Sequence, residues 1–557
     1  MSASSKKKLR KEQNAAALTE KQQKERTEAK KLKKQTIAFV AVIALVLAIG
    51  IGSLTVTAYN NSGIAERNTT ALTIGEHKLS AAELSYFYFD AINAFYSNWY
   101  NSYGESAAAY LSMFYGLDIT KPLDEQMYDE EKNLTFAEYF VNLAVENAVN
   151  AYTMYDLATA KGQVLDELGK ANVEYSLLNL ELSSKNAGYS KPTQYLKAVY
   201  GNGATVESFQ SYLELMALSD TFQNTTYDGL TYSDSDINTY NEEHFNEFSS
   251  FTYDTFYVST SDLLVCTADE DDKDHEHSQE ELDAALLAAQ NVVSSIKEAK
   301  PATTEELNKV IRGLDAYAEK ESVACTEAKD KLYSAISDAE IVEWLADSSR
   351  KAGDLTVVNH TNETTDESGN KVTNTYGFTV VLFHERNDNE TKLVNVRHIL
   401  KAFKNGTTDE LGNTVYSLES MKEAEKAINT LKDTWVSGEK TEESFKALVA
   451  DNSDDSGSVS NGGLYENVYP GQMVTAFNDW CFDEARQSGD YGIVETEYGY
   501  HLVYFVGSSD VTYRDYMIEK AMRNSDFDKW YQEQVDAAKY TVNDTSKLNT
   551  GFIIAGY

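Results

Sequence analysis

Two histidines and one aspartate are the residues whose types and settings could support chemistry in this chain. His398 lies in the strand-like segment 396–400, Asp455 follows a stretch of helical character, and His501 lies in a later strand-like segment. Imidazole and carboxylate groups orient one another through hydrogen bonds, so the three side chains could form a small polar site. Taken singly, each histidine is more typical of an ordinary core or surface position. Only the joint arrangement with neighbouring motifs favours a site.

Short motifs surround these residues in a fixed order. The strand-like segment 396–400 precedes a helix at 418–436 that has one apolar face, and a second helix-like stretch covers 445–450. Three further motifs follow: Asn461-Gly462-Gly463-Leu464, Pro470-Gly471-Gln472-Met473-Val474-Thr475-Ala476-Phe477, and Tyr498-Gly499-Tyr500-His501. The ordered set resembles the parvulin family of peptidyl-prolyl cis/trans isomerases over residues 391–508.

The resemblance implies an activity and a polar centre. His398 and His501 would form a central histidine pair, and Asp455 takes a position where some parvulins have Cys. We expect Asp455 to orient the pair and to set its tautomers. Rotation about an X-Pro bond faces a barrier of about 18–20 kcal/mol. It makes and breaks no covalent bond, so we expect neither cofactor nor metal.

The resemblance also implies an apolar pocket that grips the proline ring. Leu464, Met473 and Phe477 would line it, and Thr496 and Tyr498 would add hydroxyl hydrogen bonds beside His501. The i, i+4 spacing of Met473 and Phe477 is in itself equally typical of core packing. The chain departs from the family where an Asp usually stands between Gly-Gly and Leu. Here Leu464 follows Gly463 directly, which puts its role in more doubt than that of Met473.

An internal repeat precedes this segment. Five residues recur with identical spacing, and both copies continue into a Tyr-Gly strand. The first copy has Trp344, Arg350, Gly353, Asp354 and Val358, and the second has Trp480, Arg486, Gly489, Asp490 and Val494. Two related α+β domains are therefore predicted, at 246–390 and 391–508.

The first copy lacks the polar set. Thr379 stands where the second copy has His501, and Phe256 or a neighbour stands where His398 would fall. We therefore expect a degenerate parvulin-like domain that serves as a binding domain or as a spacer.

The region 59–245 is predicted to be an all-helical, chaperone-like domain. Ser80 and Glu83 form a capping-box pattern before a helix at 81–100 that is rich in Tyr and Phe, and a second helix is expected at 136–161. The aromatic residues fit either an ordinary core or an open cradle for unfolded chains. A helix at 513–540, within the C-terminal segment 509–557, is expected to pack back on this domain. The layout resembles the PrsA and SurA families of extracytoplasmic foldases and chaperones.

The charge of the chain is divided between a basic head and an acidic body. Residues 1–35 hold 12 Lys+Arg and 4 Asp+Glu, whereas the remainder holds 37 and 84. The acidic body argues against a nucleic-acid partner. An apolar run begins at Ile37, so we expect a transmembrane anchor at 36–58 with 1–35 cytoplasmic and the body outside. A signal peptide cleaved after Ala58 is the alternative.

The remaining candidate sites are weak. Three cysteines, Cys266, Cys325 and Cys481, argue against a disulfide framework, and Cys481 is expected in the core. His275 and His277 lie in an acidic run that fits a solvated loop better than a metal site.

The sequence therefore predicts a membrane-anchored, extracytoplasmic peptidyl-prolyl isomerase and foldase. Its clients would be unfolded or exported polypeptides with X-Pro bonds. One alternative is a holdase chaperone with a vestigial isomerase domain, and another is a non-catalytic surface protein that keeps the fold.

Overall fold

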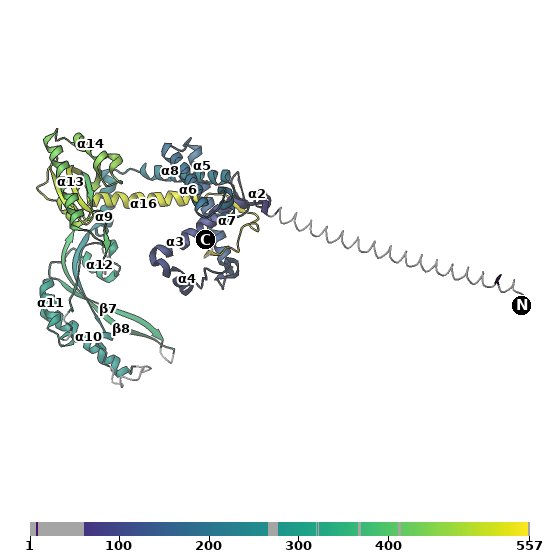
Figure 1. Ribbon diagram of the computed structural model, residues 1–557. Coiled ribbons are helices and arrows are strands. Elements are labelled where there is room, and N and C mark those ends of the chain that lie inside the picture. The colour runs from purple at the N-terminus through teal and green to yellow at the C-terminus, as the bar shows by residue number, and fades with distance from the viewer. Residues whose placement is uncertain are drawn as a thin grey trace. The chain divides into compact units, whose positions relative to one another are not determined.

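The structure is a computed structural model that describes residues 7–8, 59, 61–265, 277–318, 320, 322–365, 369–409 and 414–554 (Figure 1). The chain divides into two units, one of 1–230 with 525–557 and one of 231–524. The predicted anchor at 36–58 and the acidic run 269–276 lie outside the described residues. None of the described helices is both long enough and apolar enough to cross a bilayer.

The first unit is mainly helical. Its elements are α2 (Ile64–Asn68), β1 (Thr70–Ile74), β2 (His77–Ser80), α3 (Ala81–Tyr103), α4 (Ala107–Tyr115), β3 (Met127–Asp129), β4 (Leu134–Thr135), α5 (Phe136–Ala160), α6 (Glu167–Asn186), α7 (Pro192–Tyr200) and α8 (Val206–Asp228), together with β15 (Tyr540–Val542). The capping box expected at Ser80 is present, because the Glu83 side chain and the Ser80 side chain each accept from the other's backbone N–H.

The expectation of an all-helical region is wrong in one respect. Strands β1, β2 and β15 form a three-stranded antiparallel sheet in which Leu72 pairs with Val542. The partner strand lies near the end of the chain, so no local pattern announces this sheet. Helix α16 (Tyr513–Asp536) ends earlier than expected, and its Trp530, Tyr531 and Val535 pack against a buried cluster of the first unit that includes Met154 and Phe222.

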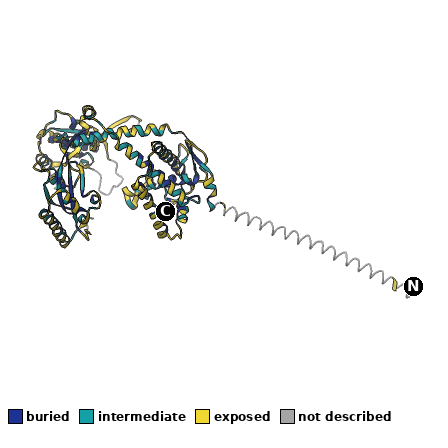
Figure 2. Ribbon diagram, turned by 90° about the horizontal axis from the view of Figure 1, so that it is seen from above, coloured by how far each residue is buried: buried dark blue, intermediate teal, exposed yellow. Residues whose placement is uncertain are grey.

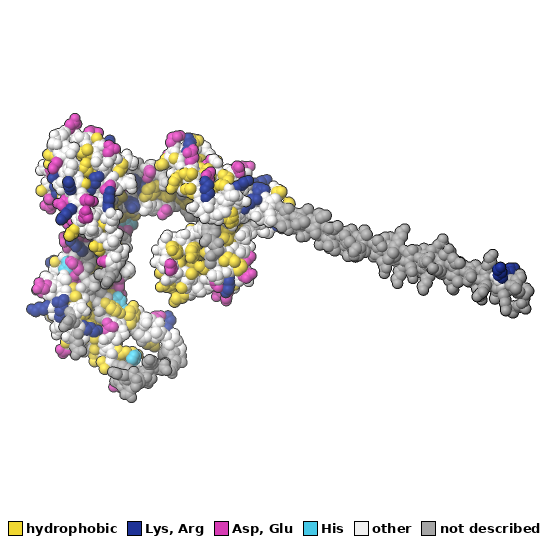
Figure 3. Space-filling view, in the orientation of Figure 1, with side chains coloured by type: hydrophobic (Ala, Val, Ile, Leu, Met, Phe, Trp, Pro, Cys, Tyr) yellow, Lys and Arg dark blue, Asp and Glu magenta, His cyan; other side chains and the backbone are white. Residues whose placement is uncertain are grey.

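Aromatic residues of the first unit serve both as core and as surface. Tyr86, Tyr88 and Phe89 of α3 are fully buried, and buried residues, dark blue in Figure 2, fill the interior of each unit. At the other end of α3 and on α4, Tyr103 and Phe114 are exposed. Hydrophobic side chains, yellow in Figure 3, gather over this α3–α4 region on the face shown.

The second unit contains two modules with the same architecture. The first consists of β5 (Ser250–Ser259), α10 (Gln279–Ala299), α11 (Thr304–Arg312), β6 (Thr326–Leu332), α12 (Ala339–Ala346), β7 (Leu355–Thr365) and β8 (Lys371–Asn387). The second consists of β9 (Lys392–Ala402), the β10–β11 hairpin (Thr407–Thr408 and Thr414–Val415), α13 (Leu418–Ser437), α14 (Glu442–Asn452), β12 (Leu464–Val468), α15 (Thr475–Cys481), β13 (Tyr491–Thr496) and β14 (Gly499–Thr512). Helix α9 (Asp234–His244) precedes both.

The two four-stranded sheets share one strand order. The first reads β6-β5-β8-β7 and the second β12-β9-β14-β13, with all neighbours antiparallel. Thr379 pairs with Val358 as His501 pairs with Val494, so these positions correspond. Thr379 also pairs with Tyr257, whereas His501 pairs with Leu400. Thr255, two residues before Tyr257, is therefore the counterpart of His398.

A buried arginine joins the ends of the two modules. Arg514, in the first turn of α16, is only 1% exposed, and its guanidinium donates to Asn241 Oδ1 at 2.7 Å and to the Asp388 carbonyl at 2.8 Å. It also lies over the Phe245 ring, 4.0 Å from the centroid. Buried guanidinium groups are stable only when their donors are satisfied, so this residue fixes where β8 ends and α16 begins.

Candidate active site

The two histidines lie on neighbouring strands of the second sheet and on the same face of it. His398 is on β9, and His501 on β14 pairs with Leu400, two residues further along β9. Side chains two residues apart on a strand share a face, so the sheet register itself brings the imidazoles together. Both are buried, with exposed fractions of 3% and 6%. Asp455 reaches them from the loop that follows α14.

Short polar contacts join the three predicted residues. Nδ1 of His398 lies 3.1 Å from Nδ1 of His501, and the two rings are stacked with their centroids 5.3 Å apart. Nε2 of His398 lies 2.8 Å from Oδ2 of Asp455. Thr496 Oγ1 lies 2.9 Å from Nε2 of His501. The polar side chains therefore form a continuous chain from Thr496 through both histidines to Asp455.

This chain determines the tautomers of the histidines. An ionised Asp455 can only accept, so Nε2 of His398 carries the proton and donates to it. Nδ1 of neutral His398 is then an acceptor, and His501 donates to it through its own Nδ1–H. Nε2 of His501 remains an acceptor for the Thr496 hydroxyl. Thr496 Oγ1 in turn accepts from the backbone N–H of Tyr498 at 3.2 Å.

Burial and hydrogen bonding set the charges of the site. Burial lowers the pKa of His501 to about 4, assisted by the neighbouring His398. Burial likewise lowers the pKa of His398, although Asp455 opposes the shift. Burial disfavours ionisation of Asp455, but hydrogen bonds from Ser458, His398 and Tyr465 outweigh it and lower its pKa to about 2. At neutral pH the pair is neutral and Asp455 is charged.

Phe477 and Met473 lie at the apolar side of the pair. Phe477, on α15, is 3% exposed, and its ring meets both imidazoles edge-on, with centroids 5.7 Å from His398 and 5.3 Å from His501. Met473 is half-buried and packs in the same apolar cluster. The structure thus places these two predicted pocket residues together.

Leu464 is not placed at the site, and Tyr465 takes the position instead. Leu464 pairs with Arg397, so it belongs to the face of the sheet opposite to His398. The Tyr465 ring lies 4.9 Å from that of His398, and its hydroxyl donates to Asp455 Oδ2 at 3.0 Å. The cause is the alternation of side chains along a strand, because Tyr465 pairs with Val396 and therefore shares the face of His398.

Tyr498 contributes its backbone and not its hydroxyl. Its side chain is 56% exposed, and its N–H holds Thr496 in place. Ser458 is a residue that the motif analysis missed. Its hydroxyl donates to Asp455 Oδ2 at 2.5 Å, and its spacing three residues after Asp455 in a polar loop is the signal that could have identified it.

A cavity of about 600 Å³ adjoins the site at Thr496. Phe403, Tyr416, Met421 and Val474 supply apolar walls, and Glu495 and Glu497 line it as well. Its size is that of a pocket for a small ligand or for a few residues of peptide. A polypeptide segment beside the histidine pair would therefore have room for the residues that flank its proline.

Comparison with known proteins agrees with this site. Residues 378–508 match the family described as PPIC-type PPIase domain. The match covers all three residues of the polar centre, Phe477 and the whole second sheet up to Ser508. The chain therefore carries a peptidyl-prolyl cis/trans isomerase domain. Its type is that of the parvulins, which agrees with the resemblance found in the motifs.

Solved structures show more distant similarity. The chain is 19% identical to the peptidyl-prolyl isomerase PrsA from Bacillus anthracis, with 27% of this chain and 61% of that chain covered and a TM-score of 0.17. For PrsA from Bacillus subtilis the identity is 14%, the coverage 75% and 94%, and the TM-score 0.26. For a SurA-like chaperone from Campylobacter jejuni the identity is 18%, the coverage 56% and 96%, and the TM-score 0.16. No curated protein matches the chain.

Proposed function

We propose that this protein is a membrane-anchored, extracytoplasmic foldase that accelerates cis/trans isomerisation of X-Pro bonds in exported polypeptides. The observation that carries the proposal is the buried, neutral histidine pair held by Asp455 and Thr496 against the Phe477 ring. It lies within a domain of the isomerase family. The substrate would place its proline ring against Phe477 and Met473.

The geometry lowers the rotational barrier through its polarity. A planar amide is stabilised by resonance that separates charge between oxygen and nitrogen, and twisting the bond removes this separation. The twisted amide is therefore less polar than either planar isomer. The apolar Phe477 ring and the neutral histidine pair favour it relative to water, which is differential binding of the transition state. A protonated histidine pair would forfeit this advantage, so the low pKa of His501 supports the mechanism.

The basic head and the apolar run support the proposed location. Residues 1–35 carry a net charge of +8, and the apolar run beginning at Ile37 follows them directly. Basic residues beside an apolar segment stay on the cytoplasmic side, which places the acidic body outside. An anchored domain meets emerging chains at a high effective concentration. Fractionation of cells, with protease added to intact spheroplasts, tests this: a protected body would contradict it.

The isomerase activity is tested with a client whose refolding is limited by an X-Pro bond. The whole chain is expected to accelerate the slow refolding phase, and His501→Ala is expected to lose the acceleration. A proline-free client refolding under the same conditions is the control, and its rate should not change. No acceleration, or equal acceleration by the His501→Ala chain, would contradict the catalytic function.

The second candidate is a holdase whose isomerase domain is vestigial. One observation favours it: exposed aromatic rings contact one another at the α3–α4 end. The ring centroids of Tyr103 and Tyr110 lie 4.4 Å apart, with the rings tilted, and those of Tyr110 and Phe114 lie 6.1 Å apart, with the rings stacked. A preorganised aromatic surface of this kind suits apolar segments of unfolded chains. Suppression of client aggregation by the His501→Ala chain, lost on Tyr110→Ser/Phe114→Ser substitution, would establish this function beside or in place of isomerisation.

A further inference from the structure

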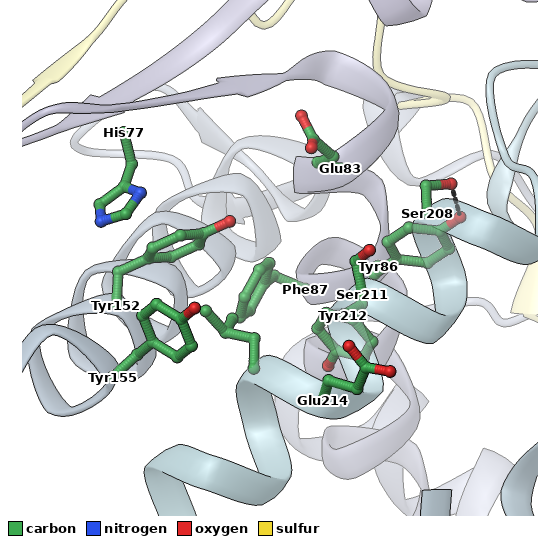
Figure 4. Close-up of a pocket in the computed structure, with 11 residues that line it drawn as sticks. His77, Glu83, Tyr86, Phe87, Tyr152, Tyr155, Ser208, Ser211, Tyr212 and Glu214 are labelled. Atoms are coloured by element: carbon green, nitrogen blue, oxygen red, sulfur yellow. Dashed lines mark hydrogen bonds between the residues drawn. The ribbon is translucent and has the colours of Figure 1, made fainter. Parts of the chain in front are cut away.

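A cavity in the first unit combines aromatic walls with carboxylates. It has a volume of about 290 Å³ and is lined by eleven residues from β2, α3, α5 and α8 (Figure 4). Tyr86, Phe87 and Tyr212 lie at its buried side, and Tyr152 and Tyr155 of α5 are half-buried at its edge. None of the described residues that line it is a lysine or an arginine.

The hydroxyl groups of the buried tyrosines are engaged elsewhere. Tyr86 Oη lies 2.7 Å from Ser208 Oγ, and the Tyr212 hydroxyl donates to Asp90. The Tyr86 and Tyr212 rings are stacked, and Phe87 meets Tyr212 edge-on. The rings are thus locked in place by neighbours, so the cavity is preformed and ring surface forms much of its lining.

Glu83 and Glu214 are the two carboxylate residues that line the cavity. Glu83 accepts through Oε2 from both the backbone N–H and the hydroxyl of Ser80. Glu214 accepts from Gln210 through Oε1 at 2.8 Å. The other carboxylate oxygen of each accepts no hydrogen bond within the described part of the chain. His77 is paired with Asp156, which lies outside the cavity lining, at 2.7 Å.

The electrostatic effect of the carboxylates reaches the rings. Burial, together with the negative charge of Glu83, raises the pKa of Tyr152 to about 12. A concave surface of the same sign lies along the other side of α8, where Asp166, Asp220 and Asp228 line a groove with Leu213 and Met216. Both surfaces around α8 therefore favour positive over negative ligands.

From this geometry we propose that the cavity is a binding site for a basic side chain, foremost arginine, of an unfolded polypeptide client. A guanidinium stacks on tyrosine faces and bonds carboxylates at its edge, which is the combination of surfaces found here. An apolar side chain would partly desolvate the half-buried Glu83 carboxylate without giving it a new partner, and an acidic one would be repelled by Glu83 and by the exposed Glu214. This inference rests on the proposed polypeptide clients but not on isomerisation.

The test uses the whole chain and a short, unstructured, proline-free peptide with one central arginine, followed by fluorescence anisotropy. Versions with lysine or with uncharged citrulline at the same position complete the set. The arginine peptide should bind roughly fivefold more tightly than the citrulline peptide, with lysine between them. Equal binding of the arginine and citrulline peptides would overturn the proposal.

Matched variants locate the effect in the cavity. Glu83→Gln/Glu214→Gln removes both charges and preserves the capping box, since Gln serves at that position as Glu does. It should weaken binding of the arginine peptide roughly tenfold and leave binding of the citrulline peptide unchanged. Glu146→Gln/Glu174→Gln removes the same charge from exposed positions outside the cavity and should change neither. Equal losses in the two double variants would show general electrostatic attraction and overturn the site.

Two further variants separate this site from the isomerase. Tyr152→Leu leaves both carboxylates in place and should weaken the arginine peptide about threefold through the lost ring. His501→Ala should keep the full preference for arginine, and Glu83→Gln/Glu214→Gln should keep the isomerisation rate on a short X-Pro peptide. If the isomerase function fails while the arginine preference persists, the cavity stands on its own. Loss of the arginine preference in His501→Ala would overturn it.

Discussion

The two modules of the second unit share one fold but carry different side chains at two matched positions on neighbouring strands. In the second module His398 and His501 form the neutral pair described above. At the corresponding positions the first module has Thr255 and Thr379. Both modules have a hydrogen bond between a threonine and a histidine here, but the two residues swap strands. In the first module Thr379 on β8 bonds His360 on β7 at 2.7 Å, whereas in the second His501 on β14 bonds Thr496 on β13.

The residues of the internal repeat explain why the two modules keep the same fold although their site residues differ. Arg350 lies over the Trp344 ring at 4.3 Å and donates to its carbonyl, and Arg486 does the same over Trp480 at 4.0 Å. Gly353 and Gly489 both have φ 91° and both donate to the carbonyl of a phenylalanine on the neighbouring strand. These contacts hold the α12–β7 and α15–β13 corners and involve none of the site residues.

The comparison shows that the fold and the site depend on separate residues. The corner contacts recur in both modules, whereas the polar chain of histidines and Asp455 is found in the second. A module that keeps the first set and lacks the second has the shape of the domain without its neutral histidine pair. The first module accordingly serves, in our proposal, as a binding or spacing domain.

The largest expected effect comes from exchanging the site residues between the modules. His501→Thr makes the second module resemble the first and should lower the catalysed refolding rate about a hundredfold, as loss of a preorganised polar group does elsewhere. Thr379→His in the first module should give no gain, because Thr255 supplies no partner imidazole. The slow refolding phase of a proline-limited client measures both. Activity gained through Thr379→His would break the comparison.

The second effect is a pH dependence confined to the module with the histidine pair. The pKa of His501 is about 4 when folded and 6.5 in the unfolded reference, so the unfolded state binds the proton first as the pH falls. The free energy of unfolding should therefore fall by about 1.4 kcal/mol per unit from pH 6.5 toward pH 4 on account of this group. Isomerisation should decline as the pair protonates near pH 4.

Asp455 adds a separate loss at lower pH. Its pKa is about 2 against 3.8, so its stabilising contribution is lost as the pH falls through that interval. Urea unfolding across about pH 2–7 measures both effects. His501→Gln should flatten the dependence of the free energy of unfolding on pH between pH 6.5 and 4. Thr379→Val, a non-titrating change at the matched position, should not. An unchanged slope in His501→Gln would show that another group is responsible.

The third effect should be equal in the two modules. Arg350→Met and Arg486→Met keep the apolar stem and remove the guanidinium, so each should lower the free energy of unfolding by about 1–2 kcal/mol. Tryptophan fluorescence during urea unfolding reports both, because each guanidinium lies over a tryptophan ring. Lys351→Met, at an exposed neighbouring position, is the control. A large difference between the two arginines would contradict a shared corner.

The smallest effect separates the two corners. Gly353→Ala and Gly489→Ala each place a side chain at φ 91°, which costs on the order of 1–2 kcal/mol. A Cβ on Gly353 would also lie 3.1 Å from the Ala302 Cβ, whereas on Gly489 the nearest heavy atom is the Tyr504 hydroxyl at 4.0 Å. Gly353→Ala should therefore lower the melting temperature more. The reverse order, by fluorescence-monitored melting, would contradict this packing.

Local patterns predicted those elements whose stabilising contacts lie close in sequence. The capping box at Ser80 and Glu83 marks the start of α3, and the apolar face at 418–436 marks α13. The core position of Cys481 is confirmed by its 1% exposure. The pairing of β15 with β1 was not predicted, because β15 follows β1 by hundreds of residues and is only three residues long.

At the site, the main residues could be predicted from the sequence, but the pairing register of strand β12 could not. His398, Asp455, His501 and Phe477 come together as the motif order indicates. That Tyr465 and not Leu464 faces His398 depends on the pairing of β12 with β9, since neighbouring residues of a strand occupy opposite faces. Ser458, which donates to Asp455, was missed although its spacing three residues after Asp455 is a local signal.

The sequence by itself determined the repeat, the helix starts and the identity of the polar site residues, because each rests on spacing along the chain. The tertiary structure decided which face of the sheet each strand residue occupies and which histidine nitrogen carries its proton. It also decided where aromatic rings and carboxylates from β2, α3, α5 and α8 enclose a cavity. These properties arise between segments distant in sequence, where strand register and helix packing, and not local propensity, set the contacts.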